Sequence, residues 1–273
     1  MPRDPNPEIR NTNPGSRVPR RVVLITGASR GIGRAIAQAC AREDAHLVLV
    51  GRDSKALRDA VREMPGAVAY RADVTKERDV NELFSKVRRD VKRLDVLVNN
   101  AGVFTYKPFV RTSLAEWDVN LRTNLTSLYL VTRAALPLLR RSPGAHIVNI
   151  LSISSRVAFP KCSAYCASKF GALGFTRVIA EEFRPLGIRV TAVLPGATST
   201  GMSKEFDFPV ARDHLLRPED VADAVVAALR QPPRAAVDEL VLTPAQGIVA
   251  SPAARRKRAR SQPRAANGRA TAS

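Results

Sequence analysis

One segment decides the fold of this chain: Val22-Val23-Leu24-Ile25-Thr26-Gly27-Ala28-Ser29-Arg30-Gly31-Ile32-Gly33. Its first four residues are apolar, and an amphipathic stretch follows it, so the order is strand, glycine turn, helix. Glycines let such a turn adopt unusual dihedral angles and approach a ligand closely, and the N-terminus of the next helix presents N–H groups that suit a phosphate. The segment therefore predicts a site for the pyrophosphate of a dinucleotide; the alternative is an ordinary turn between strand and helix.

Length and composition indicate a globular protein. The chain has 273 residues, 45% of them hydrophobic, enough for one large α/β domain. It has no apolar run near the ~20 residues that span a bilayer, and no apolar region of a signal peptide at its start. The three cysteines, Cys40, Cys162 and Cys166, form no disulfide framework, and no further His or Cys beside them completes a metal site. We therefore expect a metal-free protein of the reducing cytoplasm with no membrane partner.

Both ends of the chain are basic and poor in large apolar residues. The formal net charge is +19, and residues 251–273 carry seven basic residues and no acidic one. Residues 1–20 and 251–273 are therefore predicted to be disordered. The run Arg255-Arg256-Lys257-Arg258 can hold nucleic acid weakly and without sequence preference. A solvated tail without any partner is the alternative that we favour.

Between these ends, residues 21–250 alternate strand and helix patterns. Most of the strand patterns are apolar throughout, as in a parallel sheet that helices cover on both faces. The alternation predicts a single α/β domain with a doubly wound, mostly parallel sheet of seven strands. The expected strands are 22–26, 46–50, 67–71, 94–98, 145–151, 188–194 and 238–243. The expected helices are 31–42, 54–63, 76–91, 113–140, 163–184 and 217–230.

Tyr165 and Lys169 are the first candidate catalytic residues. They lie four residues apart on an expected helix and so share one face of it. A free tyrosine titrates near pH ~10, and an adjacent ammonium group favours the phenolate and lowers this pKa. A general acid or base works best with a pKa near the working pH. The alternative for this pair is two surface residues of a helix.

Polar residues at other points of the expected sheet extend this site. Ser152 follows a strand at the carboxyl edge, where ligands of such folds bind and a hydroxyl can stabilise charge on a carbonyl oxygen. Ser154 and Ser155 are alternatives by chemistry alone. The turn Asn99–Gly102 leaves room for a nucleotide to pass. Asn124 is an amide inside an apolar helical pattern, where local hydrogen bonding is the usual role and a place in the site is the alternative.

Together these motifs resemble the short-chain dehydrogenase/reductase family over about residues 20–245. The motifs that carry the resemblance are Thr26–Gly33, Asp73-Val74, Asn99–Gly102, Asn124, Ser152, Tyr165, Lys169 and Pro195-Gly196. The resemblance implies a single-domain Rossmann fold. It also implies a nicotinamide-dependent oxidoreductase that interconverts a carbonyl with a secondary alcohol or a hydroxy acid by hydride transfer.

The family's residue roles map onto matching positions of this sequence. The resemblance implies that Tyr165 exchanges a proton with the substrate oxygen and that Lys169 lowers the pKa of Tyr165 and binds the nicotinamide ribose. It implies that Ser152 orients the substrate and that Asn124 holds a water in a proton relay. The residues implied to bind the cofactor are Gly27, Ser29, Arg30, Gly31, Ile32, Gly33, Arg52, Asp73, Val74, Asn100, Ala101, Gly102, Tyr165, Lys169, Pro195, Gly196, Thr198 and Thr200.

The end of the second expected strand distinguishes NADP(H) from NAD(H). An acidic side chain there would accept the ribose hydroxyls and repel a 2′-phosphate. Gly51 stands at this position and Arg52 follows it, while Arg30 adds a second guanidinium from the glycine turn. Guanidinium groups bind phosphate through two parallel hydrogen bonds. We predict a preference for NADP(H), with NAD(H) possible if Asp53 takes the acidic role instead.

The substrate is a small carbonyl or alcohol compound that the sequence defines only broadly. A lid is expected at 198–216. The apolar residues expected around the substrate are Met202, Phe206, Phe208, Phe104, Ile153, Phe159 and Phe109. A 3-oxoacyl-carrier-protein reductase is an alternative, although the segment after Glu239–Pro244 lacks the Gly-Gly found in that branch of the family. A non-catalytic protein that binds a nucleotide or polyanion through basic tails is the second alternative.

Two helical patterns carry more apolar residues than one sheet face needs. They are 113–140 and 163–184, and the surplus residues are Leu128, Leu130, Phe170, Leu173 and Phe175. In the family that the sequence resembles, such helices pair across a twofold axis. We therefore expect a homodimer or homotetramer.

Overall fold

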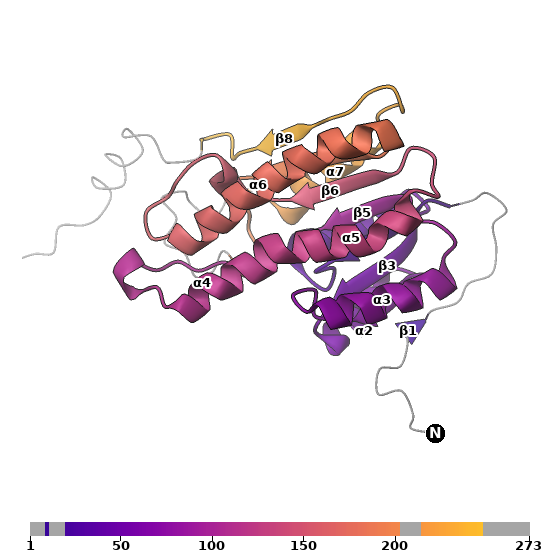
Figure 1. Ribbon diagram of the computed structural model, residues 1–273, viewed down its shortest axis with the longest axis horizontal. Helices are drawn as coiled ribbons and strands as arrows, with labels where there is room; N and C mark the ends of the chain where they lie inside the picture. The colour runs from indigo at the N-terminus through magenta and orange to yellow at the C-terminus, as the bar shows by residue number, and fades with distance from the viewer. Residues whose placement is uncertain (1–8, 11–19, 203–213, 248–273) are drawn as a thin grey trace, which may run out of the picture.

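The computed structural model describes residues 9–10, 20–202 and 214–247. They form one sheet with the strand order β1-β4-β3-β2-β5-β6-β7-β8 and helices on both faces (Figure 1). The strands are β1 (Ile9–Arg10), β2 (Val22–Thr26), β3 (His46–Gly51), β4 (Val68–Arg71), β5 (Val96–Asn99), β6 (His146–Ile150), β7 (Arg189–Pro195) and β8 (Glu239–Leu242). Strands β2 to β8 pair in parallel, which confirms the predicted doubly wound, seven-stranded parallel sheet.

The predicted helices are also present, with one interruption. The α-helices are α1 (Gly31–Arg42), α2 (Ser54–Glu63), α3 (Glu77–Asp90), α4 (Leu114–Leu121), α5 (Ser127–Leu139), α6 (Ser163–Phe183) and α7 (Pro218–Leu229). Short 3-10 turns lie at η1 (Phe109–Arg111), η3 (Ile153–Ser155) and η4 (Arg184–Leu186). The single helix expected over 113–140 was wrong, because the π-helical segment η2 (Arg122–Thr126) separates α4 from α5.

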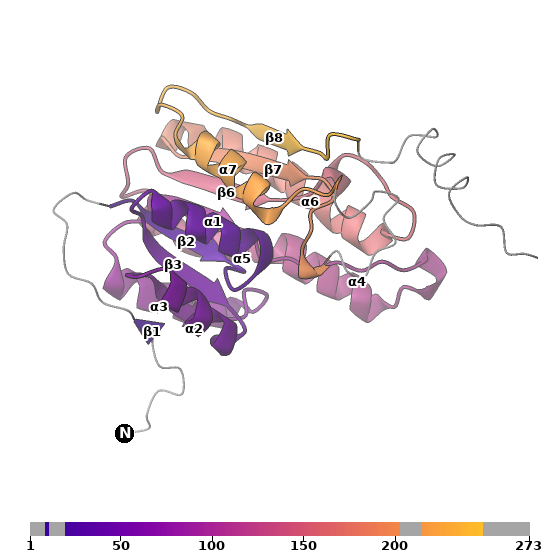
Figure 2. The same ribbon diagram turned by 180° about the vertical axis from the view of Figure 1, so that it is seen from behind.

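Alternate residues of each central strand pack into two separate hydrophobic cores, one on each face of the sheet. Val23 and Ile25 of β2 pack in the core beneath α1, α2 and α7, whereas Leu24 packs in the core beneath α3 and α5. The first set of helices faces the viewer in Figure 2 and the second in Figure 1. A central strand therefore needs apolar residues at every position, which explains the unbroken apolar patterns of the sequence.

The two-residue strand β1 is a difference from the sequence prediction. Residues 1–20 were expected to be disordered, yet Ile9 and Arg10 pair antiparallel with Ala69 and Val68 at the β4 edge of the sheet. Backbone hydrogen bonds can recruit almost any extended residues to an open sheet edge, so composition gave no sign of this pairing. Residues 1–8 and 11–19 of the expected N-terminal extension, the C-terminal tail 251–273 and residues 203–213 of the expected lid lie outside the described residues.

The strand order reverses between β2 and β5, the two strands at the centre of the sheet. The chain runs from β2 outward through β3 and β4, then returns to β5 on the other side of β2. In open parallel sheets the crevice for a ligand lies outside the carboxyl ends of the strands at such a reversal. The turns after β2 and β5 are those that carry Gly27 and Asn100. The topology thus places the glycine turn and the second motif at the same edge.

His146 of β6 is a buried imidazole that stays neutral. Its Nε2 lies 2.7 Å from Thr191 Oγ1, and that hydroxyl donates its own proton to Val237 O. Nε2 must therefore carry the ring proton, and Nδ1 finds no hydrogen-bond partner among the described residues. Burial, together with the nearby charges of Arg189 and Arg21, lowers the pKa of His146 from 6.5 to about 3.

This histidine predicts a loss of stability in mild acid. Below pH 6.5 the unfolded imidazole takes up a proton that the folded one refuses until about pH 3, so stability falls as pH falls through that window. The expected slope is ~1.4 kcal/mol per pH unit for each such group. Urea unfolding at pH 7.5, 6.0 and 5.0 measures it. His146→Leu should flatten the slope without removing it, because burial lowers the pKa of His46 in the same direction. An equal slope in the variant would contradict this account.

Candidate active site and nucleotide cradle

The glycine turn after β2 is shaped to hold an anion. Gly27 and Gly31 both have positive φ, at 65° and 56°, which L side chains rarely adopt. Arg30 is the N-cap of α1, no side chain caps the helix, and its first turn contains no acidic residue. The N–H groups at this helix start therefore face the edge of the sheet without a side-chain acceptor. A phosphate group would complement both their hydrogen-bonding capacity and the helix dipole.

Asn100 joins this turn to the one after β5. Its Nδ2 donates to Thr26 O at 3.0 Å and to Gly27 O at 3.1 Å. The Thr26 hydroxyl accepts hydrogen bonds from the backbone N–H groups of Asn100 and Ala101. A β-carbon at Gly33 would lie 2.4 Å from both Asn100 Nδ2 and Gly27 O. This third glycine is therefore required by packing between the two turns.

The end of β3 carries an arginine and no free carboxylate. Asp53, the acidic alternative from the sequence, is the N-cap of α2 and accepts hydrogen bonds from the backbone N–H groups of Lys55 and Ala56. Arg52 is exposed beside it. Arg71, at the end of β4, donates from Nε to the Arg52 carbonyl at 3.2 Å. Sequence reasoning missed Arg71, and only the pairing of Gly51 with Arg71 in the parallel register could have placed it here.

Asp73 and Val74 follow β4 at the same edge. Asp73 Oδ1 accepts from the backbone N–H and the hydroxyl of Thr75, at 3.1 and 2.7 Å. Burial raises the pKa of Asp73, but these hydrogen bonds and the charges of Arg52 and Lys76 outweigh it, so the pKa lies below its ordinary value. Val74 is buried. Asp73 thus shapes the turn that presents Val74 and is electrostatically linked to Arg52.

Tyr165, Ser152 and Lys169 meet at the carboxyl end of β6. The Ser152 hydroxyl accepts from the backbone N–H of Ser154 at 3.0 Å, and its interaction with Tyr165 lowers the pKa of that phenol. Lys169 Nζ lies 5.7 Å from the centre of the Tyr165 ring and donates to Ile150 O at 3.2 Å. All three side chains are buried. Among the three serines weighed by chemistry alone, Ser152 is the one that affects the pKa of Tyr165.

The pKa of Tyr165 differs from the sequence expectation. Lys169 was expected to lower it, but burial raises it to about 12, against the opposing hydrogen bond with Ser152. Burial also lowers the pKa of Lys169 to about 8. Both shifts have one cause, because removal from water disfavours the phenolate and the ammonium alike. In this structure Tyr165 is therefore a neutral phenol at neutral pH.

Asn124 lies in the π-helical segment, and its side chain forms hydrogen bonds with the backbone of Val103. Its Oδ1 accepts from Val103 N at 2.9 Å, and its Nδ2 donates to Val103 O at 3.0 Å and to Ser168 Oγ at 2.9 Å. A β-carbon at Gly102 would lie 3.3 Å from Asn124 Oδ1 and 4.0 Å from Lys169 Nζ. The side chain therefore fixes the segment after β5 against α6. The implied water relay is not assigned to this side chain, whose polar atoms already have partners.

The segment after β7 closes the opposite side of the site. Gly196 N donates to Leu242 O at 2.7 Å, and Thr198 Oγ1 donates to Gly196 O at 3.0 Å. The two ends of the expected lid are joined, because Ser199 N donates to Leu216 O at 2.7 Å and Leu216 N to Ala197 O at 3.0 Å. A β-carbon at Gly31 would lie 3.6 Å from Thr200 Cγ2. The segment of the expected lid therefore begins beside the glycine turn.

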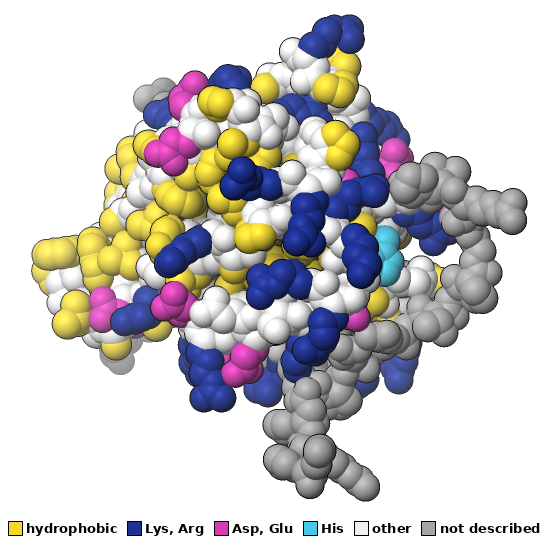
Figure 3. All heavy atoms as spheres, turned by 45° about the vertical axis from the view of Figure 1, so that its right-hand side comes forward, with side chains coloured by type: hydrophobic (Ala, Val, Ile, Leu, Met, Phe, Trp, Pro, Cys, Tyr) yellow, Lys and Arg dark blue, Asp and Glu magenta, His cyan; other side chains and the backbone are white. Residues whose placement is uncertain are grey.

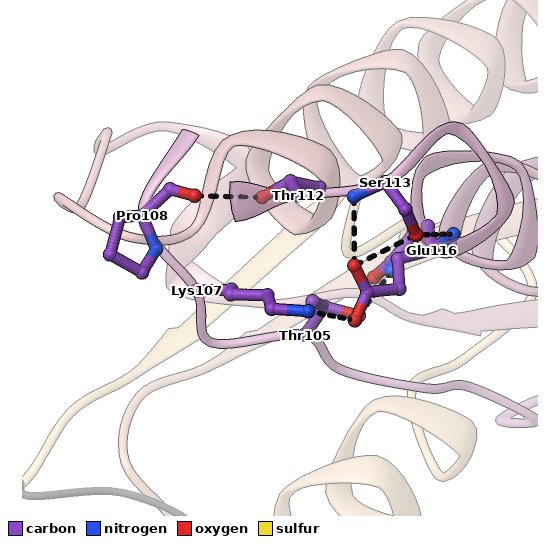
Figure 4. A network of polar contacts seen from close by, with 7 residues as sticks. Thr105, Lys107, Pro108, Thr112, Ser113 and Glu116 are labelled. Atoms are coloured by element: carbon purple, nitrogen blue, oxygen red, sulfur yellow. Dashed lines mark hydrogen bonds and ion pairs between the residues drawn. The ribbon is translucent and has the colours of Figure 1, made fainter. Parts of the chain in front are cut away.

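A braced loop forms the wall beside Tyr165. Phe104 packs edge-on against the Tyr165 ring, with 4.5 Å between ring centres. Figure 4 shows how the following residues are held: Lys107 Nζ lies 2.7 Å from Glu116 Oε1, and Ser113 and Glu116 form a capping box at the start of α4. These contacts, with Lys107 first, lower the pKa of Glu116 to about 2. At neutral pH Glu116 is therefore ionised, and its contacts with Lys107 and Ser113 hold the loop in place.

The apolar surroundings of Tyr165 include part of the expected set. Phe104 and Phe159 pack against the cluster of Cys162, Tyr165 and Cys166. Ile153 is buried, whereas Phe109 is 76% exposed on η1 and is not part of that cluster. Its prediction as a pocket residue was wrong, because the capping box directs the chain into α4 and leaves η1 on the outside. Phe206 and Phe208 lie outside the described residues.

The described residues contain neither a metal-binding cluster nor a membrane-spanning helix. Within 9–10, 20–202 and 214–247, no three His, Cys, Asp or Glu side chains gather closely enough to bind a metal ion. No described helix has the length and apolar character that crossing a bilayer requires.

Comparison with known proteins identifies the family. The family model described as short chain dehydrogenase matches residues 21–208. The chain therefore belongs to the short-chain dehydrogenase family of oxidoreductases, as the motifs predicted. The match spans the glycine turn, the Asn99–Gly102 turn and the Ser152, Tyr165 and Lys169 cluster.

Its relatives include proteins named for different substrates. A sepiapterin reductase of Chlorobaculum tepidum is 35% identical over 241 residues, which cover 84% of this chain and 98% of that protein. The structure of an alcohol dehydrogenase from the archaeon Thermococcus sibiricus, complexed with 5-hydroxy-NADP, matches with a TM-score of 0.78 and 30% identity, over 84% of this chain and 98% of that one. A 3-ketoacyl-(acyl-carrier-protein) reductase from Brucella melitensis, complexed with NADH, matches with a TM-score of 0.76 and 29% identity, over 83% and 98%.

Proposed function

We propose that this protein is an NADP(H)-dependent oxidoreductase that interconverts a carbonyl compound and a secondary alcohol or hydroxy acid, with Tyr165 as the proton donor and acceptor. The observation that carries the proposal is the convergence of three buried side chains, Ser152, Tyr165 and Lys169, at the strand ends that face the glycine turn, with Lys169 Nζ 5.7 Å from the centre of the Tyr165 ring. A module that only bound nucleotides would have no need of these three side chains together. The relatives named above are reductases and a dehydrogenase, which supports the same reaction class.

Tyr165, Ser152 and Lys169 each have a separate role in carbonyl reduction. A bound nicotinamide supplies or accepts the hydride. Tyr165, protonated at neutral pH, donates its phenolic proton to the substrate oxygen as negative charge develops there, and Ser152 contributes a second hydroxyl to the same oxygen. Lys169, with a pKa of about 8, is mostly an ammonium at pH 7 and stabilises the phenolate that remains. The proton returns to Tyr165 from solvent after each turnover.

The cradle at the other end fits a phosphorylated dinucleotide. The uncapped start of α1 and the left-handed Gly27 and Gly31 suit the pyrophosphate. Gly51 leaves the end of β3 without a carboxylate, and Asp53 is committed to its helix. Arg52, braced by Arg71, supports recognition of a 2′-phosphate. The cofactor preference therefore rests on the chemistry of this edge, and the Thermococcus sibiricus structure complexed with 5-hydroxy-NADP is consistent with it.

The substrate class stays broad. Phe104, Phe159 and Ile153 give the region beside Tyr165 an apolar character, which suits a hydrophobic carbonyl or alcohol. A 3-oxoacyl-carrier-protein reductase remains the second candidate, supported by the Brucella melitensis structure. A panel of ketones, aldehydes, alcohols and 3-oxoacyl thioesters, each assayed with NADPH and NADH at the absorbance of the reduced nicotinamide, tests both. The absence of turnover with every member would contradict the proposal.

Tyr165→Phe removes the hydroxyl and keeps the ring. We expect kcat on the best substrate to fall by roughly 10²–10⁴-fold, because proton transfer loses its donor. Nucleotide affinity, measured by fluorescence titration, should change less than about twofold, since the cradle is untouched. Tyr129→Phe on α5 is the matched control, because Tyr129 is 45% exposed on a different helix. A near-normal kcat for Tyr165→Phe would remove Tyr165 from the mechanism.

Arg52→Ala tests the preference for NADP(H). A hydrogen bond to a charged group contributes roughly 1.5–3 kcal/mol, so NADPH affinity should weaken about ten- to a hundredfold. NADH affinity should change little. Arg71→Ala should produce a smaller loss of the same selectivity, because Arg71 braces the Arg52 carbonyl. Arg58→Ala, an exposed arginine on the neighbouring helix α2, is the control. Equal losses for both nucleotides would show that Arg52 does not contact the 2′-phosphate.

We further propose that α5 and α6 form the interface of a homodimer or homotetramer. Of the five residues expected there, Leu128 and Leu173 lie in the core and Leu130 and Phe175 pack against it, so only Phe170 is substantially exposed, at 45%. The exposed apolar residues of the two helices are Tyr129, Phe170 and Val178. Figure 3 shows hydrophobic side chains gathered toward the side from which α4 projects, and many Lys and Arg elsewhere on that face.

Phe170→Glu should dissociate such an assembly. A carboxylate buried at an interface without a partner is strongly unfavourable, so the particle mass from light scattering at micromolar concentration should fall toward that of one chain. Leu186→Glu, at a residue 44% exposed on η4, should leave the mass unchanged. A monomeric parent protein would contradict the proposed assembly.

A further inference from the structure

The ends of α3 and α5 meet in a strongly basic part of the surface. The two helices pack on the same core, and both end toward the right-hand side of Figure 1. Their ends are in contact, because Leu94 N donates to Leu138 O at 3.2 Å and Arg141 Nη1 donates to Lys92 O at 3.4 Å. Residues 86–93 and 140–141 contain seven basic side chains and one acidic side chain. Figure 3, which brings this side forward, shows many Lys and Arg and few Asp and Glu.

Most of these cations have no opposite charge beside them. Arg93 is paired with Asp95 at 2.8 Å, and the single acidic residue, Asp90, accepts a hydrogen bond from the Tyr70 hydroxyl. Five exposed cations form no ion pair with any described carboxylate, and together they make up the α3–α5 basic surface: Arg88, Arg89, Lys92, Arg140 and Arg141.

Helix dipoles explain only part of this charge. A dipole favours cations in the last turn of a helix, where Arg88 and Arg89 lie. Lys92 and Arg141, however, lie beyond the ends of α3 and α5. Like charges so close together repel one another, and an anionic partner would relieve that repulsion. The α3–α5 basic surface therefore has the electrostatic character of a binding site for a polyanion.

The side chains of this surface suit phosphate groups in particular. Four of its five residues are arginines, whose planar guanidinium groups bind phosphate through two parallel hydrogen bonds. No large, substantially exposed apolar side chain of the described chain lies within 86–93 or 140–142. A protein partner or a bilayer would be expected to cover apolar side chains, whereas interfaces with nucleic acid are more polar and much more positively charged.

We propose that the α3–α5 basic surface binds the phosphate backbone of double-stranded nucleic acid without sequence preference. Packed helices have axes about 8–10 Å apart, a spacing between the widths of the minor and major grooves of DNA, which are about 6 and 12 Å. Cations at the end of α3 and cations at the end of α5 can therefore contact phosphates on both sides of one groove. Contacts of this kind fix the position of the duplex and carry no sequence information.

The α3–α5 basic surface lies at the opposite edge of the sheet from the candidate active site. Helix α3 leads into β5 and α5 leads into β6, so both helices end where these strands begin, whereas Asn100 and Ser152 follow the carboxyl ends of the same strands. A duplex on this surface would leave the active site open, so the proposal does not depend on the proposed function. It also differs from weak binding by the tail 251–273, because these cations lie at the ends of packed helices.

Fluorescence anisotropy of a short labelled DNA duplex, titrated with the full chain between about 50 and 200 mM salt, tests the proposal. Each phosphate contact contributes about −0.9 to the slope of log K against log salt, so five contacts predict a slope of about −4 or steeper. Two double variants, Arg88→Gln with Arg89→Gln and Arg140→Gln with Arg141→Gln, should each make the slope shallower by about 2. A second duplex of unrelated sequence should give the same result.

A charge-matched variant on the other face of the sheet is the control. Arg58→Gln with Arg62→Gln on α2 removes the same net charge and should bind like the parent protein. A parent protein that does not bind at the lowest salt would overturn the proposal. So would variants of the α3–α5 basic surface that keep the parent affinity and slope, or a control that loses as much as they do.

Lysine footprinting of the parent protein decides the matter even if a variant does not fold. Acetylation with an N-hydroxysuccinimide ester, followed by peptide mass spectrometry, compares Lys92 with Lys55, an exposed lysine of α2. Saturating duplex should slow the acetylation of Lys92 severalfold and leave Lys55 unchanged. Equal rates at Lys92 with and without the duplex would overturn the proposal. Vesicles that contain phosphatidylserine, at the same phosphate concentration, should not protect Lys92, and protection as strong as that by the duplex would overturn the assignment to nucleic acid.

Discussion

The side-chain amide of Asn100 is the contact on which the rest of the site depends. It donates to the carbonyls of Thr26 and Gly27 and so joins the turns after β2 and β5, between which the strand order reverses. These carbonyls belong to a turn whose left-handed glycine carries them away from the sheet ladder. Without the amide, two polar groups near the core edge would lose their partners, at a cost of about 1–3 kcal/mol each. Gly33 has no β-carbon for the same reason, since one would collide with this amide.

A second amide extends this link to the catalytic side chains. Val103, three residues after Asn100, is bonded at both its N–H and its carbonyl by Asn124, which also donates to Ser168 of α6. Ser168 adjoins Lys169, and α6 approaches the π-helical segment closely, since a β-carbon at Gly171 would lie 3.0 Å from Leu125 Cδ2. The hydrogen bonds of two asparagines, joined by the backbone from Asn100 to Val103, therefore connect the glycine turn to the helix of Tyr165 and Lys169. These contacts fix the position of the glycine turn relative to the helix that carries Tyr165.

Most of this architecture could be predicted because local sequence patterns, such as apolar runs and glycine turns, indicate its helices, strands and turns. Strands buried on both faces read as unbroken apolar runs, and the bounds predicted for β2, α1 and α2 agree with the structure. The doubly wound sheet of seven parallel strands followed from the βα alternation and the family resemblance. Tyr165 and Lys169 were found from their spacing, and Ser152 from its place after a strand together with the family resemblance. Residue chemistry alone does not distinguish Ser152 from Ser154 and Ser155.

What the sequence could not supply came from contacts between distant segments. The pairing of β1 depends on an open sheet edge, and the position of Arg71 depends on the register of β4 against β3. The π-helical segment contains Asn124, whose hydrogen-bond partner Val103 lies in a distant part of the chain. Because periodicity carries no sign of such a contact, it predicted one continuous helix. The sequence left two roles open for Asp53, a ribose ligand or a residue of the turn. Its hydrogen bonds to the backbone of α2 show that the carboxylate caps this helix. Phe109 was misjudged because hydrophobicity does not tell which side of a loop faces the site.

Burial, more than any single charge, sets the protonation of the site. It raises the pKa of Tyr165 and lowers that of Lys169, so at neutral pH a neutral phenol stands beside an ammonium that water does not reach. Negative charge on Cys166 acts in the same direction on the phenol. A group held protonated can give its proton at once, whereas one that must first lose a proton near pH 12 cannot begin alcohol oxidation unaided. Under the proposed function, the fold therefore holds Tyr165 at neutral pH in the form that donates a proton, and the phenolate left after the transfer depends on the ammonium of Lys169 for its stabilisation.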